Sequence, residues 1–94
     1  MQIEIIRTNG ARETHEVPKA EPLKAIAKLV GYPFFDTVNL RDGRVMLVDD
    51  EGAIRDPRAP VNAEATKLYH AVCRPGTTWP IRGHVAIARD ADFE

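Results

Sequence analysis

The sequence has little of several features that would point to a compartment or to a chemistry. It contains one cysteine and one tryptophan, and only 6% of its 94 residues are aromatic. A single cysteine cannot form an intramolecular disulfide, which agrees with a reducing compartment. No apolar run approaches the ~20 residues that span a bilayer, and the first ten residues lack the cationic and apolar blocks of a signal peptide. The chain is therefore expected to be cytoplasmic.

An excess of charge of one sign is missing as well. Thirteen Lys and Arg residues balance fourteen Asp and Glu residues, for a formal net charge of −1. Non-specific nucleic-acid binders usually carry a marked positive excess, so this balance argues against that class. A content of 44% hydrophobic residues in a chain of this length predicts one globular domain over residues 1–94.

Motifs for catalysis and for phosphate binding are absent. The sequence has no Gly-x-Gly-x-x-Gly and no Gly-x-x-x-x-Gly-Lys. The acidic stretch 49–52 fails as a calcium loop, because Leu47 and Arg58 stand where ligands are required. Cys73 is predicted near a helix C-terminus, where the dipole disfavours a thiolate. We therefore expect no enzymatic activity and no cofactor.

One pair of residues has the spacing of metal ligands. His70 and Cys73 are three apart on a predicted helix, so their side chains can share one face. A structural zinc site needs two more ligands, and no Cys-x-x-Cys or His-x-x-x-His pair is present to supply them. Cys73 is better interpreted as a small buried hydrophobic residue. No metal site is expected.

The N-terminal third predicts a hairpin followed by a helix. Asn9-Gly10 is a strong turn signal between strands over 2–8 and 12–17. A helix begins at Pro22, which suits the first helical position, and ends before Gly31.

Charge and hydrophobicity favour one register for this hairpin. A three-residue loop over 9–11 sets Ile3 opposite Val17 and Arg7 opposite Glu13, which keeps one face mostly apolar. A strand over 2–8 that lies at the edge of the sheet would offer a surface for a homodimer.

A second hairpin is predicted in the middle of the chain. Strands over 38–40 and 45–48 flank Asp42-Gly43, which fits a two-residue turn that pairs Leu40 with Val45. The alternate residues of the second strand point the other way, so both of its faces are expected to be covered.

The last third predicts a helix and a closing strand. Asn62 is placed to cap the helix, and the strand runs over 81–88. The apolar positions of the helix follow its period: Ala65, Leu68, Tyr69 and Val72. The element order ββαββαβ predicts an α+β fold, with two helices packed on a mostly antiparallel sheet. The opening hairpin and helix resemble the N-terminal half of a ubiquitin-like β-grasp domain.

Five residues on predicted loops are candidates for binding. Trp79 stands beside Pro80 and is either a lid over the core or an exposed binding anchor. Loop arginines either form a solvated surface or recognise carboxylates, phosphates and protein interfaces. These arginines are Arg41, Arg44, Arg55 and Arg58.

A series of short motifs over residues 38–93 resembles a family of small domains of unknown function carried by phages, plasmids and other mobile elements. The residues that carry the likeness are Val48-Asp49-Asp50-Glu51-Gly52, Asn62, Ala65-Thr66, Leu68-Tyr69, Pro75-Gly76, Ile81, Gly83, Val85 and Ile87. Members often have aspartate after the last glycine, where this chain has His84. The resemblance implies no reaction, cofactor or catalytic residue.

Together these observations predict a small, non-enzymatic protein-binding accessory protein of mobile-element type. The partner is expected to be another protein, bound through Trp79 and the loop arginines. The alternative is a nucleic-acid or nucleotide binder in which those arginines contact phosphates.

Overall fold

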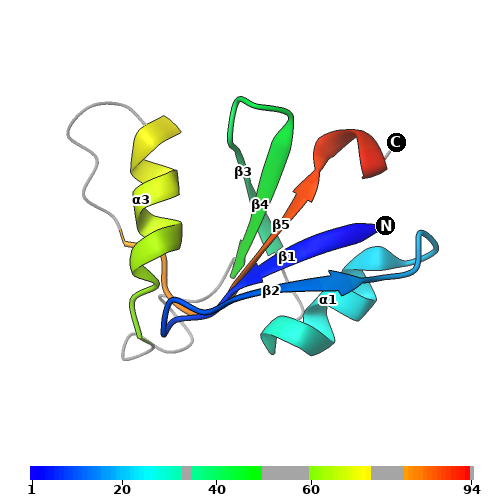
Figure 1. Ribbon diagram of the computed structural model, residues 1–94, viewed down its shortest axis with the longest axis horizontal. Helices are drawn as coiled ribbons and strands as arrows, with labels where there is room; N and C mark the ends of the chain where they lie inside the picture. The colour runs from blue at the N-terminus through cyan, green and yellow to red at the C-terminus, as the bar shows by residue number, and fades with distance from the viewer. Residues whose placement is uncertain (33–34, 50–59, 73–79, 94) are drawn as a thin grey trace.

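The computed structural model describes residues 1–32, 35–49, 60–72 and 80–93. Within these ranges the chain forms one antiparallel sheet in the order β2-β1-β5-β4-β3, together with two α-helices and a short 3-10 helix (Figure 1). The elements are β1 (Gln2–Ile6), β2 (Arg12–Glu16), α1 (Pro22–Val30), β3 (Phe35–Asn39), β4 (Arg44–Asp49), α3 (Ala63–Val72), β5 (Val85–Arg89) and η1 (Asp90–Phe93). The predicted α+β class and antiparallel sheet are confirmed.

Each α-helix covers its own face of the sheet. Side chains alternate between the two faces of a strand, so the buried residues divide into two clusters. The cluster under α1 contains Ile3, Ile5, Ile26, Val30, Val45, Leu47, Ala86 and Ala88. The cluster under α3 contains Ile6, Met46, Val48, Ala65, Val85 and Ile87. The prediction that both faces of β4 are covered is confirmed.

Both helix boundaries follow the local signals in the sequence. Pro22 is the first residue of α1, and Gly31 ends it with φ +91°, donating its N–H to the Ala27 carbonyl at 2.9 Å. The left-handed conformation of Gly31 is one that favours glycine strongly, because a Cβ is disfavoured there. The α3 helix begins directly after Asn62, as predicted.

Asn62 joins three segments at the start of α3. Its side chain is buried, and Oδ1 accepts a hydrogen bond from the Ala65 N–H at 3.1 Å, which is the predicted cap. Its Nδ2 donates to the carbonyls of Ile6 at 2.9 Å and Gly83 at 3.0 Å. One side chain therefore fixes the end of β1, the segment before β5 and the first turn of α3.

The predicted register of the first hairpin is wrong by one residue in each strand. Ile3 lies opposite His15, not opposite Val17. The turn begins one residue earlier than expected, because the Gly10 N–H donates to the Arg7 carbonyl at 3.0 Å and Gly10 takes φ +88°. This is the three-residue loop in which a turn is followed by a left-handed residue. The partner of each β1 residue is shifted by two positions along β2 relative to the prediction. Because two is an even number, every side chain keeps its predicted face.

The predicted register of the second hairpin is wrong by one residue, which reverses the faces. Val45 lies opposite Asn39, and the Leu40 N–H donates to the Arg44 carbonyl at 3.0 Å. The loop takes three residues because Arg41 adopts φ +69° ahead of Gly43. As a result Val38 and Leu40 share the α3 face with Met46 and Val48 rather than with Val45 and Leu47.

The expected edge strand is also wrong. β1 lies between β2 and β5, so the edge strands of the sheet as described are β2 and β3. The opening hairpin and helix occur in the order that the β-grasp likeness implies. Beyond α1, the first and last strands of the described sheet, β1 and β5, pair in antiparallel fashion.

Candidate functional site

Among the described residues, a groove of about 410 Å³ lies between β2 and α1. Its floor is apolar and its outer wall carries two exposed lysines from successive turns of the helix. The groove is lined by His15 of β2, by Val17 directly after β2, and by Lys24, Ala25, Lys28 and Leu29 of α1. The groove runs along β2, whose outer backbone groups have no neighbouring strand within residues 1–32, 35–49, 60–72 and 80–93.

The hydrogen-bonding pattern of β1 and β2 fixes which backbone groups face outward. The Arg7 N–H donates to the Ala11 carbonyl and the Val17 N–H to the Met1 carbonyl, both at 2.9 Å. Antiparallel pairs alternate between hydrogen-bonded and non-hydrogen-bonded, so the odd-numbered residues of β2 bond to β1. The N–H and C=O groups of the even-numbered residues, Arg12, Thr14 and Glu16, therefore point away from the sheet.

The opposite edge of the sheet is protected in a way that β2 is not. In β3 the same reasoning makes Thr37 an outward-facing residue, because Leu40 is bonded to Arg44 and the pairs alternate. The Thr37 N–H donates to Oδ1 of Asp36 at 2.9 Å. The Asp36 carboxylate therefore accepts the hydrogen bond that the Thr37 N–H would otherwise donate to an incoming strand. Among the described residues, the outward N–H groups of β2 have no such side-chain acceptor.

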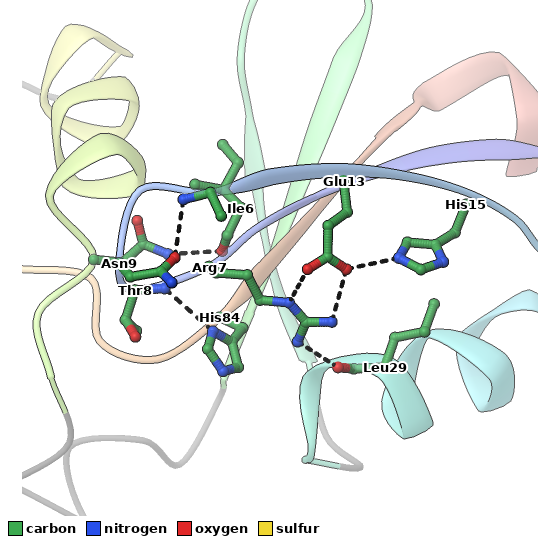
Figure 2. Close-up of polar contacts among 10 residues, drawn as sticks. Ile6, Arg7, Thr8, Asn9, Glu13, His15, Leu29 and His84 are labelled. Carbon is green, nitrogen blue, oxygen red and sulfur yellow. Dashed lines mark hydrogen bonds and ion pairs between the residues drawn. The ribbon is translucent and has the colours of Figure 1, made fainter.

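An ion-pair network sets the two walls of the groove relative to one another. Arg7, at the end of β1, donates from Nε and Nη2 to the two carboxylate oxygens of Glu13, each at 2.9 Å (Figure 2). Its Nη1 donates to the carbonyl of Leu29 at 2.8 Å, in the last turn of α1, where carbonyls have no partner within the helix. Arg7 thus connects β2 to α1 through its rigid guanidinium group.

Glu13 also positions His15, which lines the groove. Nε2 of His15 lies 2.8 Å from Oε1 of Glu13, on the α1 face of β2 (Figure 2). The hydrogen bonds from Arg7 first, and then from His15, lower the pKa of Glu13 to about 2. Glu13 is therefore ionised at neutral pH, and its charge is already matched by Arg7. The carboxylate acts as a structural anion that orients both neighbours.

A second histidine is tied into the same region. The Thr8 N–H donates to Nδ1 of His84 at 3.2 Å (Figure 2), so Nδ1 is the acceptor and Nε2 carries the proton. Burial, and then the charge of Arg7, lowers the pKa of His84. The hydroxyl of Tyr32 donates to the His84 carbonyl. His84 therefore has the contacts of a neutral structural residue.

The structure separates the candidate arginines that it describes. Nη2 of Arg41 donates to the carbonyl of Val72 at the end of α3, at 2.9 Å. Arg44 binds the carboxylate of Asp42 through Nε at 2.9 Å, and this ion pair lowers the pKa of Asp42 and raises that of Arg44. Both guanidinium groups thus have partners within the chain. Trp79, Arg55 and Arg58 lie outside the described residues.

The described side chains form no cluster suited to a metal ion. Within the described ranges, no three His, Cys, Asp or Glu side chains gather where they would hold a metal ion. Cys73 lies outside those ranges, so the pair it forms in sequence with His70 stays untested. Neither helix in the described part of the chain has the length and apolar content needed to cross a membrane.

The groove beside β2 was not predicted, although the sequence carries a signal for it. The segment Arg12-Glu13-Thr14-His15-Glu16 is polar throughout, which is typical of an edge strand, whereas the strand over 2–8 contains three isoleucines. The contrast identifies β2 as the edge. The position of α1 beside it depends on tertiary packing and has no local signal.

Several residues that carry the mobile-element likeness meet around the first turns of α3. The Ile81 N–H donates to Oγ1 of Thr66 at 2.8 Å, next to the bonds that Asn62 makes. The motif therefore has a structural explanation here. Comparison with models of protein families, with curated proteins and with solved structures gave no match.

Proposed function

We propose that this chain is a non-enzymatic protein-binding module, which associates with another protein chain by adding one of that chain's strands to β2. The observation that carries the proposal is the open edge of β2 beside the groove that α1 walls. In strand addition, backbone hydrogen bonds supply affinity, and pockets for alternate side chains supply specificity. Here the outward N–H and C=O groups of Arg12, Thr14 and Glu16 would form the backbone hydrogen bonds. The groove would accept the partner's side chains.

The shape of the site supports an extended partner rather than a compact ligand. The Arg7–Glu13–Leu29 network holds β2 and α1 apart as two fixed walls, so the site is built before a partner arrives. A preorganised edge reduces the entropy lost on association.

In the alternative, a phosphate-binding surface, the two arginines that the structure describes already have partners within the chain. Of its four arginines, Arg44 is neutralised by Asp42, and Arg41 is bonded to the end of α3. Clustered, uncompensated arginines are what phosphate recognition requires. We therefore retain protein binding. A cytoplasmic location and an accessory role in a mobile element belong to the same proposal, supported by cysteine content and by the motifs over 38–93.

The proposal is tested by blocking the edge without disturbing the sheet. Proline at an outward-facing position removes a donor that β1 does not use. Thr14→Pro should therefore prevent strand addition, while Thr37→Pro is a matched substitution at the middle of the opposite edge. The assay is selection from a displayed library of random peptides against sparsely immobilised protein.

Wild type and Thr37→Pro should enrich the same extended sequences, and Thr14→Pro should enrich none of them. Thermal unfolding followed by circular dichroism establishes that both variants are folded. Enrichment of the same peptides by Thr14→Pro would overturn the proposal, and so would failure of wild type to enrich any sequence.

A further inference from the structure

We infer that the strand added at β2 is β2 of a second copy of this chain, running antiparallel about a two-fold axis at Thr14. The inference rests on the proposed function, because it uses the same edge. It is specific because the two ends of β2 carry opposite charges, Arg12 at one end and Glu16 at the other.

The outward-facing backbone groups limit the register. Only Arg12, Thr14 and Glu16 present N–H and C=O groups away from β1, so hydrogen-bonded pairs between two copies must form among these residues. Centring the axis on Thr14 pairs Arg12 with Glu16 twice and Thr14 with itself. All three residues are used, for about six backbone hydrogen bonds. An axis centred on Glu13 or His15 leaves one of the three unpaired.

The side chains agree with the same register on both faces. On the α3 face, Arg12 of each copy lies opposite Glu16 of the other, and the two threonines face each other. On the α1 face, Glu13 of each copy lies opposite His15 of the other. Opposite charges across strands stabilise a sheet and like charges destabilise it. Centring on Glu13 would instead oppose two carboxylates.

The charged groups that would meet are accessible. The side chain of Glu16 is 78% exposed and that of Arg12 is 46% exposed. Arg12 already contacts Glu4 at 2.7 Å and Glu64 at 3.4 Å. A guanidinium group has five N–H donors, so a third carboxylate can join this cluster. The two acidic neighbours also hold Arg12 on the face of the sheet where the second copy's Glu16 would arrive.

The two-fold axis stands perpendicular to the sheet, so each helix keeps its face. Both α1 helices would lie on one side and both α3 helices on the other, and the two sheets would become one. Lys24 and Lys28, which line the groove of each copy, would then lie on the α1 side of the joined sheet. Isologous contacts of this kind close after two copies and do not propagate.

The experiment is a charge exchange measured by sedimentation equilibrium over a range of protein concentrations. Wild type and Thr37→Pro should dimerise with the same dissociation constant, and Thr14→Pro should be monomeric. Glu16→Arg sets two arginines together on both sides of the axis and should weaken the dimer by about tenfold or more. Arg12→Glu should do the same with two glutamates.

The mixture of the two single variants is the decisive sample. Each pairs only weakly with itself, but one copy of Glu16→Arg and one of Arg12→Glu restore opposite charges at both positions. Heterodimers should therefore form with near wild-type affinity. Arg12→Glu also removes the contacts to Glu4 and Glu64, so its fold is checked by thermal unfolding; the double variant, with both exchanges in one chain, should dimerise as wild type does.

The outcomes separate this inference from the proposed function. A wild type that stays monomeric at high concentration, yet enriches peptides through β2, overturns the second copy as occupant and leaves strand addition standing. A wild type that neither dimerises nor enriches peptides overturns both. A dimer that is indifferent to Thr14→Pro and to the charge exchanges also overturns the inference, because its interface lies elsewhere.

Discussion

Arg7 and Glu13 form a bidentate ion pair, with two hydrogen bonds of 2.9 Å, that connects the end of β1 to the strand beside it. The pair is diagonal across the hairpin, since Ile5 is the residue directly opposite Glu13. The same arginine reaches the last turn of α1. The geometry of the β2 edge therefore depends on the guanidinium group of Arg7 and on the Glu13 carboxylate that it binds.

The first prediction concerns pH. The pKa of Glu13 is about 2 in the folded chain and 4.5 as its ordinary value. A lowered folded-state pKa contributes stability that is present above pH ~4.5 and lost as the pH falls towards 2. The melting temperature of wild type should exceed that of Glu13→Gln at pH 7, and the difference should shrink below pH ~4.5 and vanish near pH 2.

Thermal unfolding followed by circular dichroism at several pH values measures this difference. Glu16→Gln is the control, because its carboxylate is exposed and lies 3.6 Å from the terminal amine rather than in the Arg7 network. A gap between wild type and Glu13→Gln that stays constant from pH 7 to pH 2 would contradict the assignment.

The second prediction concerns Asn62. Replacing it with alanine removes the cap of α3 and leaves the carbonyls of Ile6 and Gly83 without their buried donor. Each such loss costs about 1–3 kcal/mol, so the variant should lose about 3 kcal/mol in free energy of unfolding. Urea denaturation measures it. Asn39→Ala, at the exposed last residue of β3, should cost less than about 1 kcal/mol; equal losses in the two variants would argue against the role of Asn62.

The third prediction concerns the amide groups of β2. In dilute protein, where the chain is monomeric, the outward N–H groups of Arg12, Thr14 and Glu16 should exchange with solvent much faster than those of Glu13 and His15. Hydrogen exchange followed by NMR resolves the alternation. Raising the protein concentration should slow the fast set selectively. Uniform exchange along the strand would be incompatible with the hydrogen-bond pattern described above.

The fourth prediction concerns Tyr32. Its ring is 5% exposed, and its hydroxyl donates to the His84 carbonyl in the segment that leads into β5. Tyr32→Phe keeps the ring and removes the hydroxyl, which also lies 3.5 Å from the Leu47 carbonyl, and should cost about 1 kcal/mol in free energy of unfolding. Chemical denaturation provides the value. An unchanged stability would mean that the hydroxyl contributes nothing to the closure of this segment.

The helices were predictable because their signals are local. Pro22, Gly31 and Asn62 each act within a few residues of their own position, and all three do what the sequence predicts. The hairpin registers were not predictable to the same accuracy. The second loop is set by Arg41 in a left-handed conformation, and no residue type other than glycine or asparagine announces that conformation reliably.

The candidate site depends on contacts between elements that are distant in the sequence. Whether β2 is an edge is decided by β5, which takes the other side of β1. The polar composition of Arg12–Glu16 signals the edge, but the wall of the groove is supplied by α1 through tertiary packing. The candidate arginines were chosen from their predicted loop positions. Arg41 and Arg44 nevertheless bind the Val72 carbonyl and the Asp42 carboxylate, which the sequence alone did not indicate.

The central position of β1 has a consequence for how the chain reaches this fold. Its inner neighbour is β5, so Glu4 pairs with Ile87, and the middle of the sheet joins the two most distant strands in the sequence. Until β5 is available, the opening strands exist only as a two-stranded hairpin, which is marginal in water. The high contact order of the β1–β5 pairing predicts slow folding for a chain of this size. It also predicts that folding on the ribosome waits for the last strand to emerge.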